Sequence, residues 1–155
     1  MSYRNLLAIA GAVALTVSAP LAHAKDKILL KTPIAFSTAL PGLGSPIPRV
    51  AEQLSLMSGG TIKMKVYEPG KLVPPFEILD AVSSGKINSG YTTAGYWAGK
   101  IPAAPLFSAV PFGPEAGEYM AWLYYGNGMN LYQEMYDQAG FNVHVIPCAI
   151  IAPET

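Results

Sequence analysis

The stretch from residue 61 to residue 92, TIKMKVYEPGKLVPPFEILDAVSSGKINSGYT, decides the fold class. Apolar side chains alternate with lysines between Thr61 and Tyr67, which is the two-residue period of a β-strand with one buried face. Ile87 to Thr92 is a second short strand-like run, and the segment between the two runs has the length of a helical connection. Strands joined in this way run parallel in one sheet, so the stretch predicts an α/β fold.

The connection between these two strands has helix signals at both ends. Pro74-Pro75 supplies a proline for the first helical turn, and Gly85 is suited to the end of the helix. Phe76, Leu79 and Val82 recur at helical spacing between them. We therefore expect these three side chains to face the core.

The residues before this stretch predict one more strand and one more helix. Ile28 to Phe36 is too apolar for a half-exposed strand and indicates a buried strand of a mainly parallel sheet. Residues 37–48 are rich in Gly and Pro, which is typical of a loop. Ser45 and Pro46 have the character of a helix cap and a first-turn proline, and Gly59-Gly60 ends that helix. The apolar positions of this helix are Ile47, Val50, Ala51, Leu54 and Met57.

The residues after this stretch are less regular. Residues 95–113, GYWAGKIPAAPLFSAVPFG, have no sustained period, and a loop of that length usually has a function or wraps a surface. Two helices are expected at 115–125 and 129–139, separated by glycines. The alternating run from Phe141 to Ile146 predicts a fourth strand. The whole pattern indicates a mainly parallel sheet flanked by helices.

The N-terminal 24 residues have the three parts of a secretory signal peptide. Arg4 supplies a positive charge, Leu6–Val17 is an apolar run, and Ala22-His23-Ala24 is a small-x-small cleavage site. The run is shorter than the roughly 20 residues that span a bilayer. We therefore expect export by the Sec route, cleavage after Ala24 and a soluble periplasmic domain at residues 25–155. A buried core helix is the alternative.

Charge and cysteine content exclude several classes of protein. Without Arg4, nine basic side chains stand against ten acidic ones, a net charge near −1. This balance offers no electrostatic footprint for nucleic acid or for an anionic membrane. Cys148 is the single cysteine, so no intramolecular disulfide can form, and we expect it to be a small buried hydrophobe.

Residue types typical of catalysis are sparse. His144 is the only histidine after the signal segment and lies on the polar face of the expected fourth strand, so we interpret it as an ordinary strand residue. No nucleophile elbow, paired metal-ligand spacing or P-loop is present. Residues 42–45, GLGS, could hold an anion through backbone N–H groups before a helix. They lack the other residues of a dinucleotide fingerprint, which favours a flexible loop.

Aromatic residues mark the ends of two predicted strands. Phe36 lies at the end of the first strand, and Tyr96 and Trp97 lie just past the third. Ligands of open parallel sheets bind outside the carboxyl ends of the strands, so the three rings are expected to converge on one crevice. The alternative is that they fill the core, and for Trp97 the two interpretations are equally good.

Three segments carry a family resemblance. They are GKLVPPFEILDAVSSGKINSGYTTAGYWAGK at 70–100, AVPFG at 109–113 and GMNLYQEMYDQAGFNVHVIP at 128–147. Together they resemble the periplasmic solute-binding subunits of TRAP transporters, the DctP-type family. AVPFG and the APET at 152–155 are most similar to the branch that binds 2-oxo acids and other small monocarboxylates.

The resemblance implies a type II-like periplasmic binding protein fold with two α/β lobes that close over an organic acid. In the family an arginine of the second lobe clamps the carboxylate; it would lie beyond Thr155, and Arg49 does not match it. The chain would then supply the first lobe and the start of the crossover. By position, Tyr96 matches a hydroxyl donor to the ligand. Glu154 falls where a close branch has a glutamine near a bound cation, which is compatible with Na⁺ or Ca²⁺.

The resulting hypothesis is a receptor, not an enzyme, that captures a small 2-oxo or 2-hydroxy monocarboxylate and delivers it to a sodium-driven TRAP permease. Phe36, Tyr96 and Trp97 would line the pocket, and Glu154 would hold a cation. No organic cofactor and no nucleic-acid partner are expected, and the tyrosine-rich helices could form a homodimer. The alternative is a secreted ligand-sensing domain or hydrolase on a similar α/β sheet.

Overall fold

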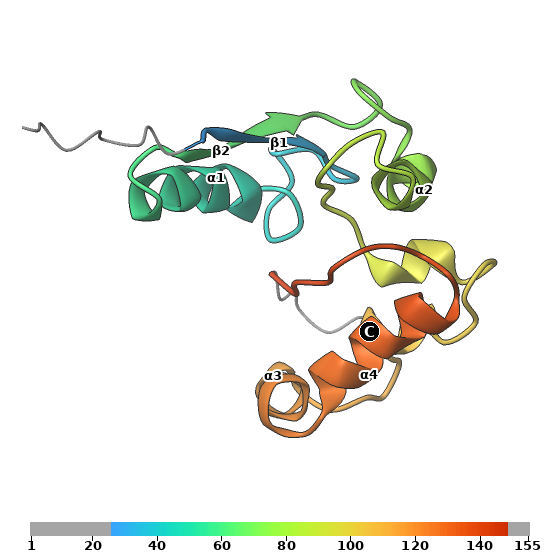
Figure 1. The fold of residues 1–155 in the computed structure, drawn as a ribbon. Coiled ribbons are helices and arrows are strands. Elements are labelled where there is room, and N and C mark those ends of the chain that lie inside the picture. Colours follow the sequence, from blue (N-terminus) through green and yellow to red (C-terminus); the bar gives the residue numbers. More distant parts are fainter. Residues whose placement is uncertain (1–25, 149–155) are drawn as a thin grey trace, which may run out of the picture.

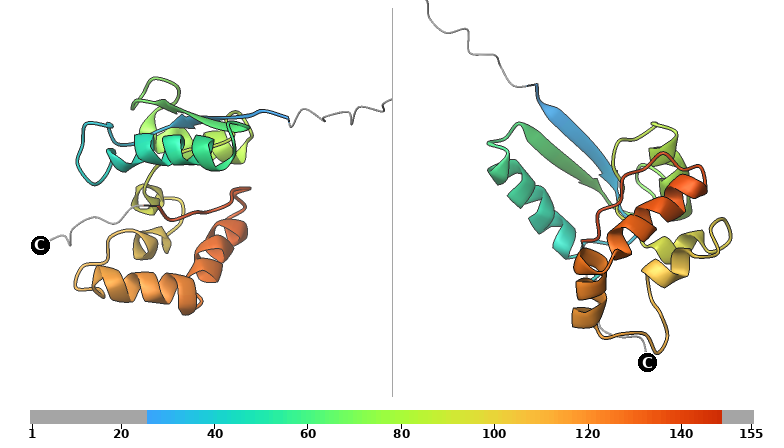
Figure 2. Two further views of the ribbon diagram at one scale, coloured as in Figure 1. Left: turned by 90° about the vertical axis from the view of Figure 1, so that its left-hand side faces the viewer. Right: turned by 60° about the horizontal axis from the view of Figure 1, so that its bottom comes forward.

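The computed structural model describes residues 26–148 (Figure 1). The predicted signal peptide, residues 1–24, and the predicted cation ligand Glu154 lie outside this range. The elements in chain order are β1 (Ile28–Pro33), α1 (Pro46–Met57), β2 (Ile62–Tyr67), the 3-10 helix η1 (Pro75–Glu77), α2 (Ile78–Ser83), the 3-10 helices η2 (Ala94–Trp97) and η3 (Ala104–Phe107), α3 (Ala116–Tyr125) and α4 (Gly128–Gln138). Figures 1 and 2 show them in two layers: the sheet with α1 and α2, and below it the later helices.

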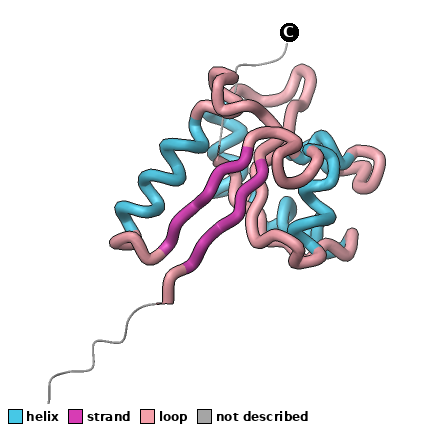
Figure 3. The backbone as a smooth tube through the Cα atoms, turned by 90° about the horizontal axis from the view of Figure 1, so that it is seen from above, coloured by secondary structure: helices cyan, strands magenta, loops and turns pink. Residues whose placement is uncertain are grey.

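The sheet confirms the predicted parallel α/β architecture. The expectation of a buried first strand up to Phe36 was wrong in part, because β1 ends at Pro33 and its first residues, Ile28 and Leu29, are exposed. β1 and β2 pair in parallel from Ile28 opposite Ile62 to Pro33 opposite Tyr67, and they run side by side in Figure 3. α1 connects them and packs against the sheet. The carboxyl ends of both strands therefore lie at the same edge.

The predicted third strand at 87–92 was wrong in its extent, because only an isolated bridge between Ile34 and Tyr91 forms there. The physical reason is the side chain of Asn88. Its Oδ1 accepts the N–H of Lys31 at 2.8 Å, and its Nδ2 donates to the carbonyl of Leu29 at 2.9 Å. One amide side chain thus takes the place of a strand backbone along this edge of β1.

The first predicted helix is confirmed between Pro46 and Met57, but its ends differ in detail. Ser45 makes no side-chain cap; its Oγ accepts the N–H of Gly42 instead. Ile47 is the buried residue of the helix, whereas Met57, predicted to face inward, is 82% exposed. The C-terminal turn of α1 therefore projects past the sheet.

The second predicted helix begins with a 3-10 turn, and this changes which side chains face inward. Leu79 is buried as predicted and Val82 packs on the core, but Phe76 is 64% exposed, contrary to prediction. A 3-10 helix has three residues per turn instead of 3.6, so the spacing that assumed an α-helix fails there. Ile78 takes the inward position.

The first part of the irregular segment 95–113 lies in the core, whereas residues 108–113 are mostly exposed. Ala94, just before the segment, and three residues within it, Trp97, Ile101 and Ala104, are among the most buried of the described residues. Their side chains pack against α2 and α4 in one cluster. The segment lacks a sustained period because short 3-10 turns alternate with bends.

The helices α3 and α4 confirm the two late helices to within one residue at each end. The predicted fourth strand was wrong: residues 141–148 contain no strand. Exposure still alternates along this segment, with Val143 and Val145 turned to the core. The backbone of the segment is hydrogen-bonded to an amide side chain instead of a neighbouring strand. Gln133 Nε2 donates to the carbonyl of Val143 at 2.8 Å, and its Oε1 accepts the N–H of Val145 at 3.0 Å. Cys148 is exposed, which corrects the expectation of a buried thiol.

Candidate functional site

The carboxyl ends of β1 and β2 meet the segment that follows the Ile34–Tyr91 bridge. The N–H of Ala35 donates to the carbonyl of Tyr91 at 2.9 Å, which holds the two chains together just beyond β1. Phe36 follows immediately. Its ring lies 6.4 Å from the ring of Tyr91, edge to face, and 5.8 Å from that of Tyr96. Phe36 and Tyr96 are therefore brought together, as the strand-end argument predicted.

Tyr96 is the centre of this group of rings. Besides Phe36, it contacts Phe76 with ring centroids 4.6 Å apart and an interplanar angle of 33°. Residues Phe36, Phe76, Tyr91 and Tyr96 form what we call the strand-end aromatic cluster. Phe76 was missed as a site residue because helical spacing assigned it to the core. Pro74 and Pro75 precede it and favour a tight first turn, so they were the sequence signal that Phe76 does not follow α-helical spacing.

Trp97 lies beneath the cluster and belongs to the core. Its side chain is 1% exposed and meets Tyr96 edge to face, with centroids 6.3 Å apart. Its Nε1 has no hydrogen-bond partner among the described residues. The placement favours the core interpretation of Trp97, and a direct ligand contact from it stays a prediction.

The loop between β1 and α1 is fixed by backbone contacts, which accounts for the GLGS sequence. A Cβ on Gly44 would lie 1.8 Å from the carbonyl oxygen of Ser37, so only glycine fits there. The hydroxyl of Tyr91 donates to the carbonyl of Leu43 at 2.5 Å. Burial raises the pKa of Tyr91 to about 12 and keeps this hydroxyl protonated at neutral pH.

Glu68, the residue directly after β2, is bound to the loop between β1 and α1. Its Oε1 accepts the hydroxyl of Thr38 at 2.5 Å, and its Oε2 accepts the N–H of Thr38 at 3.3 Å. The hydrogen bond from the Thr38 side chain lowers the pKa of the Glu68 carboxyl, so the group is ionised at neutral pH. It fixes the start of the β1–α1 loop.

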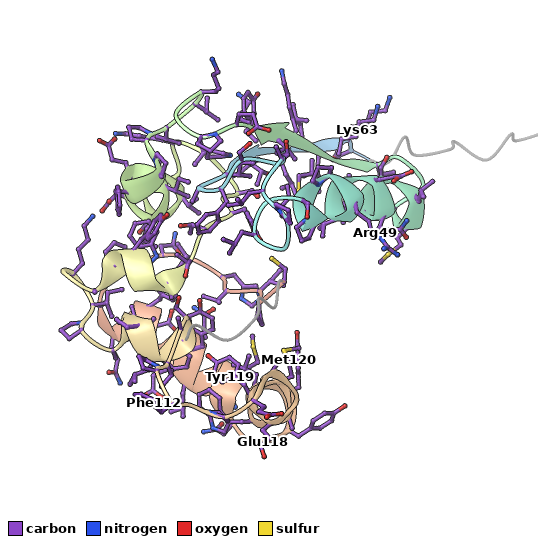
Figure 4. The ribbon with its side chains drawn as sticks, turned by 180° about the vertical axis from the view of Figure 1, so that it is seen from behind. Arg49, Lys63, Phe112, Glu118, Tyr119 and Met120 are labelled. Carbon is purple, nitrogen blue, oxygen red and sulfur yellow. The ribbon has the colours of Figure 1, made fainter. Side chains whose placement is uncertain are left out.

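Phe76 is the exposed member of the cluster, whereas Tyr91 is buried. A shallow depression of about 580 Å³ lies elsewhere, between the 100–103 segment, Phe107 and α4, and none of the four cluster residues lines it. Figure 4 places Phe112, Glu118 and Tyr119 on the α3 side of the molecule, in the layer opposite to the one that carries Lys63.

The described residues do not by themselves form a metal centre. Between residues 26 and 148 no group of three or more His, Cys, Asp or Glu side chains is placed to hold a metal ion. Glu154 lies outside this range. Within the same range, no helix is long and apolar enough to cross a membrane.

The sequence profile of the bacterial extracellular solute-binding protein family 7, DctP, matches residues 46–144. The chain belongs to this family. The match confirms the predicted resemblance, and it covers α1, β2 and all later elements of the structure.

Among curated DctP relatives is the monocarboxylate 2-oxoacid-binding periplasmic protein of Nostoc sp. (strain PCC 7120). It is 40% identical over 98 residues, which is 63% of this chain and 26% of the relative. The chain thus spans about a quarter of the length of this relative.

Two solved TRAP periplasmic solute-binding proteins have the same fold. One, from Pseudoalteromonas atlantica, contains sodium and pyruvate; the other, from Colwellia psychrerythraea, contains calcium and pyruvate. Each is 33% identical with a TM-score of 0.69, and the match covers 74% of this chain and 35% of the solved chain. The described residues therefore have the α/β arrangement of a type II-like periplasmic binding protein.

Proposed function

We propose that this chain forms part of a periplasmic receptor that captures a small 2-oxo or 2-hydroxy monocarboxylate and delivers it to a sodium-driven TRAP permease. The observation that carries the proposal is the convergence of Phe36, Phe76 and Tyr96 at the carboxyl edge of a parallel sheet. Ligands of such sheets bind at this edge. Relatives at 33% identity contain pyruvate, which is a 2-oxo monocarboxylate of the proposed ligand class.

The strand-end aromatic cluster would bind the apolar part of the acid and exclude water from it. Tyr96 would donate a hydrogen bond from its hydroxyl to the ligand. The charge of the carboxylate needs a cationic partner, which we assign to an arginine of a second lobe that closes over the cluster. Without that partner, a buried carboxylate loses about 3–5 kcal/mol of binding free energy.

A cation bound with the acid is part of the proposal. Glu154 would supply a carboxylate oxygen, the donor type that Na⁺ and Ca²⁺ take. The described residues offer no acidic cluster to replace it. No step of capture is assigned to the cation beyond charge compensation of the ligand.

The same proposal makes residues 1–24 a signal peptide, residues 25–155 the N-terminal part of the receptor, and the protein a non-enzyme. General acid–base catalysis needs a positioned titratable side chain at the reacting group. Capture and release by lobe closure need none.

Isothermal titration calorimetry tests the proposal on protein expressed from the entire coding sequence. Pyruvate and 2-oxobutyrate would be titrated with sodium, with calcium and with a chelator. We expect binding that depends on the cation, and weaker binding for Tyr96→Phe. Absence of binding heat for every 2-oxo and 2-hydroxy monocarboxylate would remove the assignment of the ligand class.

A further inference from the structure

The Glu68 carboxylate is a negative charge held in place at the edge where the ligand is proposed to bind. Its two oxygens accept hydrogen bonds from the hydroxyl and the N–H of Thr38. Both donors belong to one residue of a loop whose path is further restricted at Gly44. The carboxylate therefore cannot turn away from this edge without losing both bonds.

This charge lies close to the strand-end aromatic cluster. Thr38 is two residues from Phe36, so their Cα atoms are at most about 7 Å apart. Glu68 also follows Tyr67, whose carbonyl accepts the N–H of Ile34 at the start of the same loop. For a ligand beside Phe36 we take a separation from the Glu68 carboxylate of roughly 10 Å, because Thr38 lies within this chain reach of Phe36 and contacts Glu68 directly.

No Lys, Arg or His side chain in the described part of the chain forms an ion pair with Glu68. The ion pair found between residues 26 and 148 joins Lys100 to Asp80, and it does not involve Glu68. The nearby lysine Lys65 instead lies over the ring of Tyr67, 5.1 Å from its centroid. The negative charge of Glu68 is therefore not neutralised by a direct ion pair among these residues.

We propose that Glu68 is a specificity-determining residue that disfavours ligands with a second carboxylate. The inference rests on the proposed function, because it assigns the selection between monocarboxylates and dicarboxylates to one side chain of that site. Coulomb repulsion scales with the charge of the ligand, so a dianion is repelled twice as strongly as a monoanion. A fixed negative charge near the strand-end aromatic cluster thus lowers the affinity for the dianion more than the affinity for the monoanion.

The size of the effect follows from the separation. At about 10 Å and an effective dielectric constant between about 20 and 80, one unit of ligand charge changes affinity by roughly 2- to 15-fold. Removal of the Glu68 charge should therefore raise the affinity for a monoanion by roughly 2- to 15-fold. The affinity for a dianion should rise by the square of the factor found for the monoanion. The ratio of the two affinities should shift toward the dianion by roughly 2- to 15-fold.

The test compares 2-oxopentanoate with 2-oxoglutarate, which share a five-carbon skeleton and differ in the terminal carboxylate. Both acids would be titrated into wild type and Glu68→Gln, made from the entire coding sequence. Glu118→Gln is the matched control, because it removes the same charge from α3, away from the sheet in Figure 4. We expect the affinity ratio to shift in Glu68→Gln alone, and the shift to shrink at high salt because ions screen the repulsion.

The outcomes separate this inference from the proposed function. If wild type binds 2-oxopentanoate and Glu68→Gln leaves the ratio unchanged, the role of Glu68 is overturned and the proposed function stands. If wild type binds no monocarboxylate, both are overturned. Should Glu68→Gln not fold, Thr38→Val replaces it: the hydroxyl donor is lost while the backbone N–H remains, so the charge is held less firmly. We expect a smaller shift of the ratio in the same direction, and an unchanged ratio overturns the inference.

Discussion

The ring of Phe76 stacks on the ring of Tyr96 at 4.6 Å although 64% of Phe76 remains exposed. An exposed phenylalanine that packs on one side only contributes little to folding. Its other side is available to a ligand. Phe76 is therefore placed to contact a ligand, whereas the neighbouring Trp97, which is 1% exposed, stabilises the core.

Phe76→Ala should weaken ligand binding more than it weakens the fold. We expect affinity for a 2-oxo acid to fall several-fold through the loss of apolar contact, and the free energy of unfolding to change by less than about 1 kcal/mol. Calorimetry and urea unfolding measure the two quantities. Phe112→Ala is the control, because Phe112 is fully exposed on the α3 side (Figure 4) and should affect neither. A Phe76→Ala variant with unchanged affinity would contradict the assignment of Phe76 to the site.

Gly44→Ala should destabilise the chain and disturb the loop that carries Thr38. Its new Cβ would lie 1.8 Å from the Ser37 carbonyl oxygen, so the backbone must shift, and we expect a loss of about 1–3 kcal/mol. Gly117→Ala is the matched control: nothing lies within 4 Å of its Cβ, and it stands in α3, where alanine is favoured over glycine by about 0.5–1 kcal/mol. Thermal unfolding of both variants measures these changes in stability. Equal effects of the two substitutions would argue against a steric role for Gly44.

Helix positions could be predicted from the sequence because each helix depends on its own periodicity and end residues. The strand at 61–67 was predictable for the same reason. The runs at 87–92 and 141–146 were not, because the side chains of Asn88 and Gln133 replace strand partners in both places. Alternation of apolar residues signals one buried face, and it is equally compatible with a side-chain partner and a backbone partner.

The candidate site was predictable in part for a related reason. Phe36 and Tyr96 follow from the rule that ligands bind at the carboxyl ends of parallel strands. Phe76 could not be predicted from this rule, because the direction of its side chain depends on the change from a 3-10 turn to an α-helical turn. Glu68 could not be predicted either, because its partner Thr38 is distant in sequence and neither residue type is unusual in a turn.

Gln133→Ala should release the segment after α4. Two hydrogen bonds to Val143 and Val145 would be lost, and each leaves a partly buried backbone group without its partner. We expect a loss of roughly 1–3 kcal/mol in the free energy of unfolding and faster hydrogen exchange of the Val145 amide. Gln138→Ala is the control, since Gln138 bonds only to Glu134 on the exposed face of α4. Unchanged exchange at Val145 would mean that its apolar contacts, not Gln133, hold the segment.

The stability of the chain at high pH should depend on Tyr91. The pKa of Tyr91 is raised to about 12 by burial, so the folded state favours the neutral phenol. The stabilisation is therefore complete below the ordinary tyrosine pKa near 10 and is lost as the pH rises toward 12, at up to about 1.4 kcal/mol per pH unit. The other buried tyrosines titrate in wild type and in Tyr91→Phe alike, so the difference between the two proteins isolates Tyr91. That difference in unfolding free energy should be constant between pH 7 and about 9 and should shrink above pH 10. A difference that stays constant to pH 12 would show that the Tyr91 hydroxyl ionises equally in the folded and unfolded chain, and its bond to Leu43 would then not hold the β1–α1 loop.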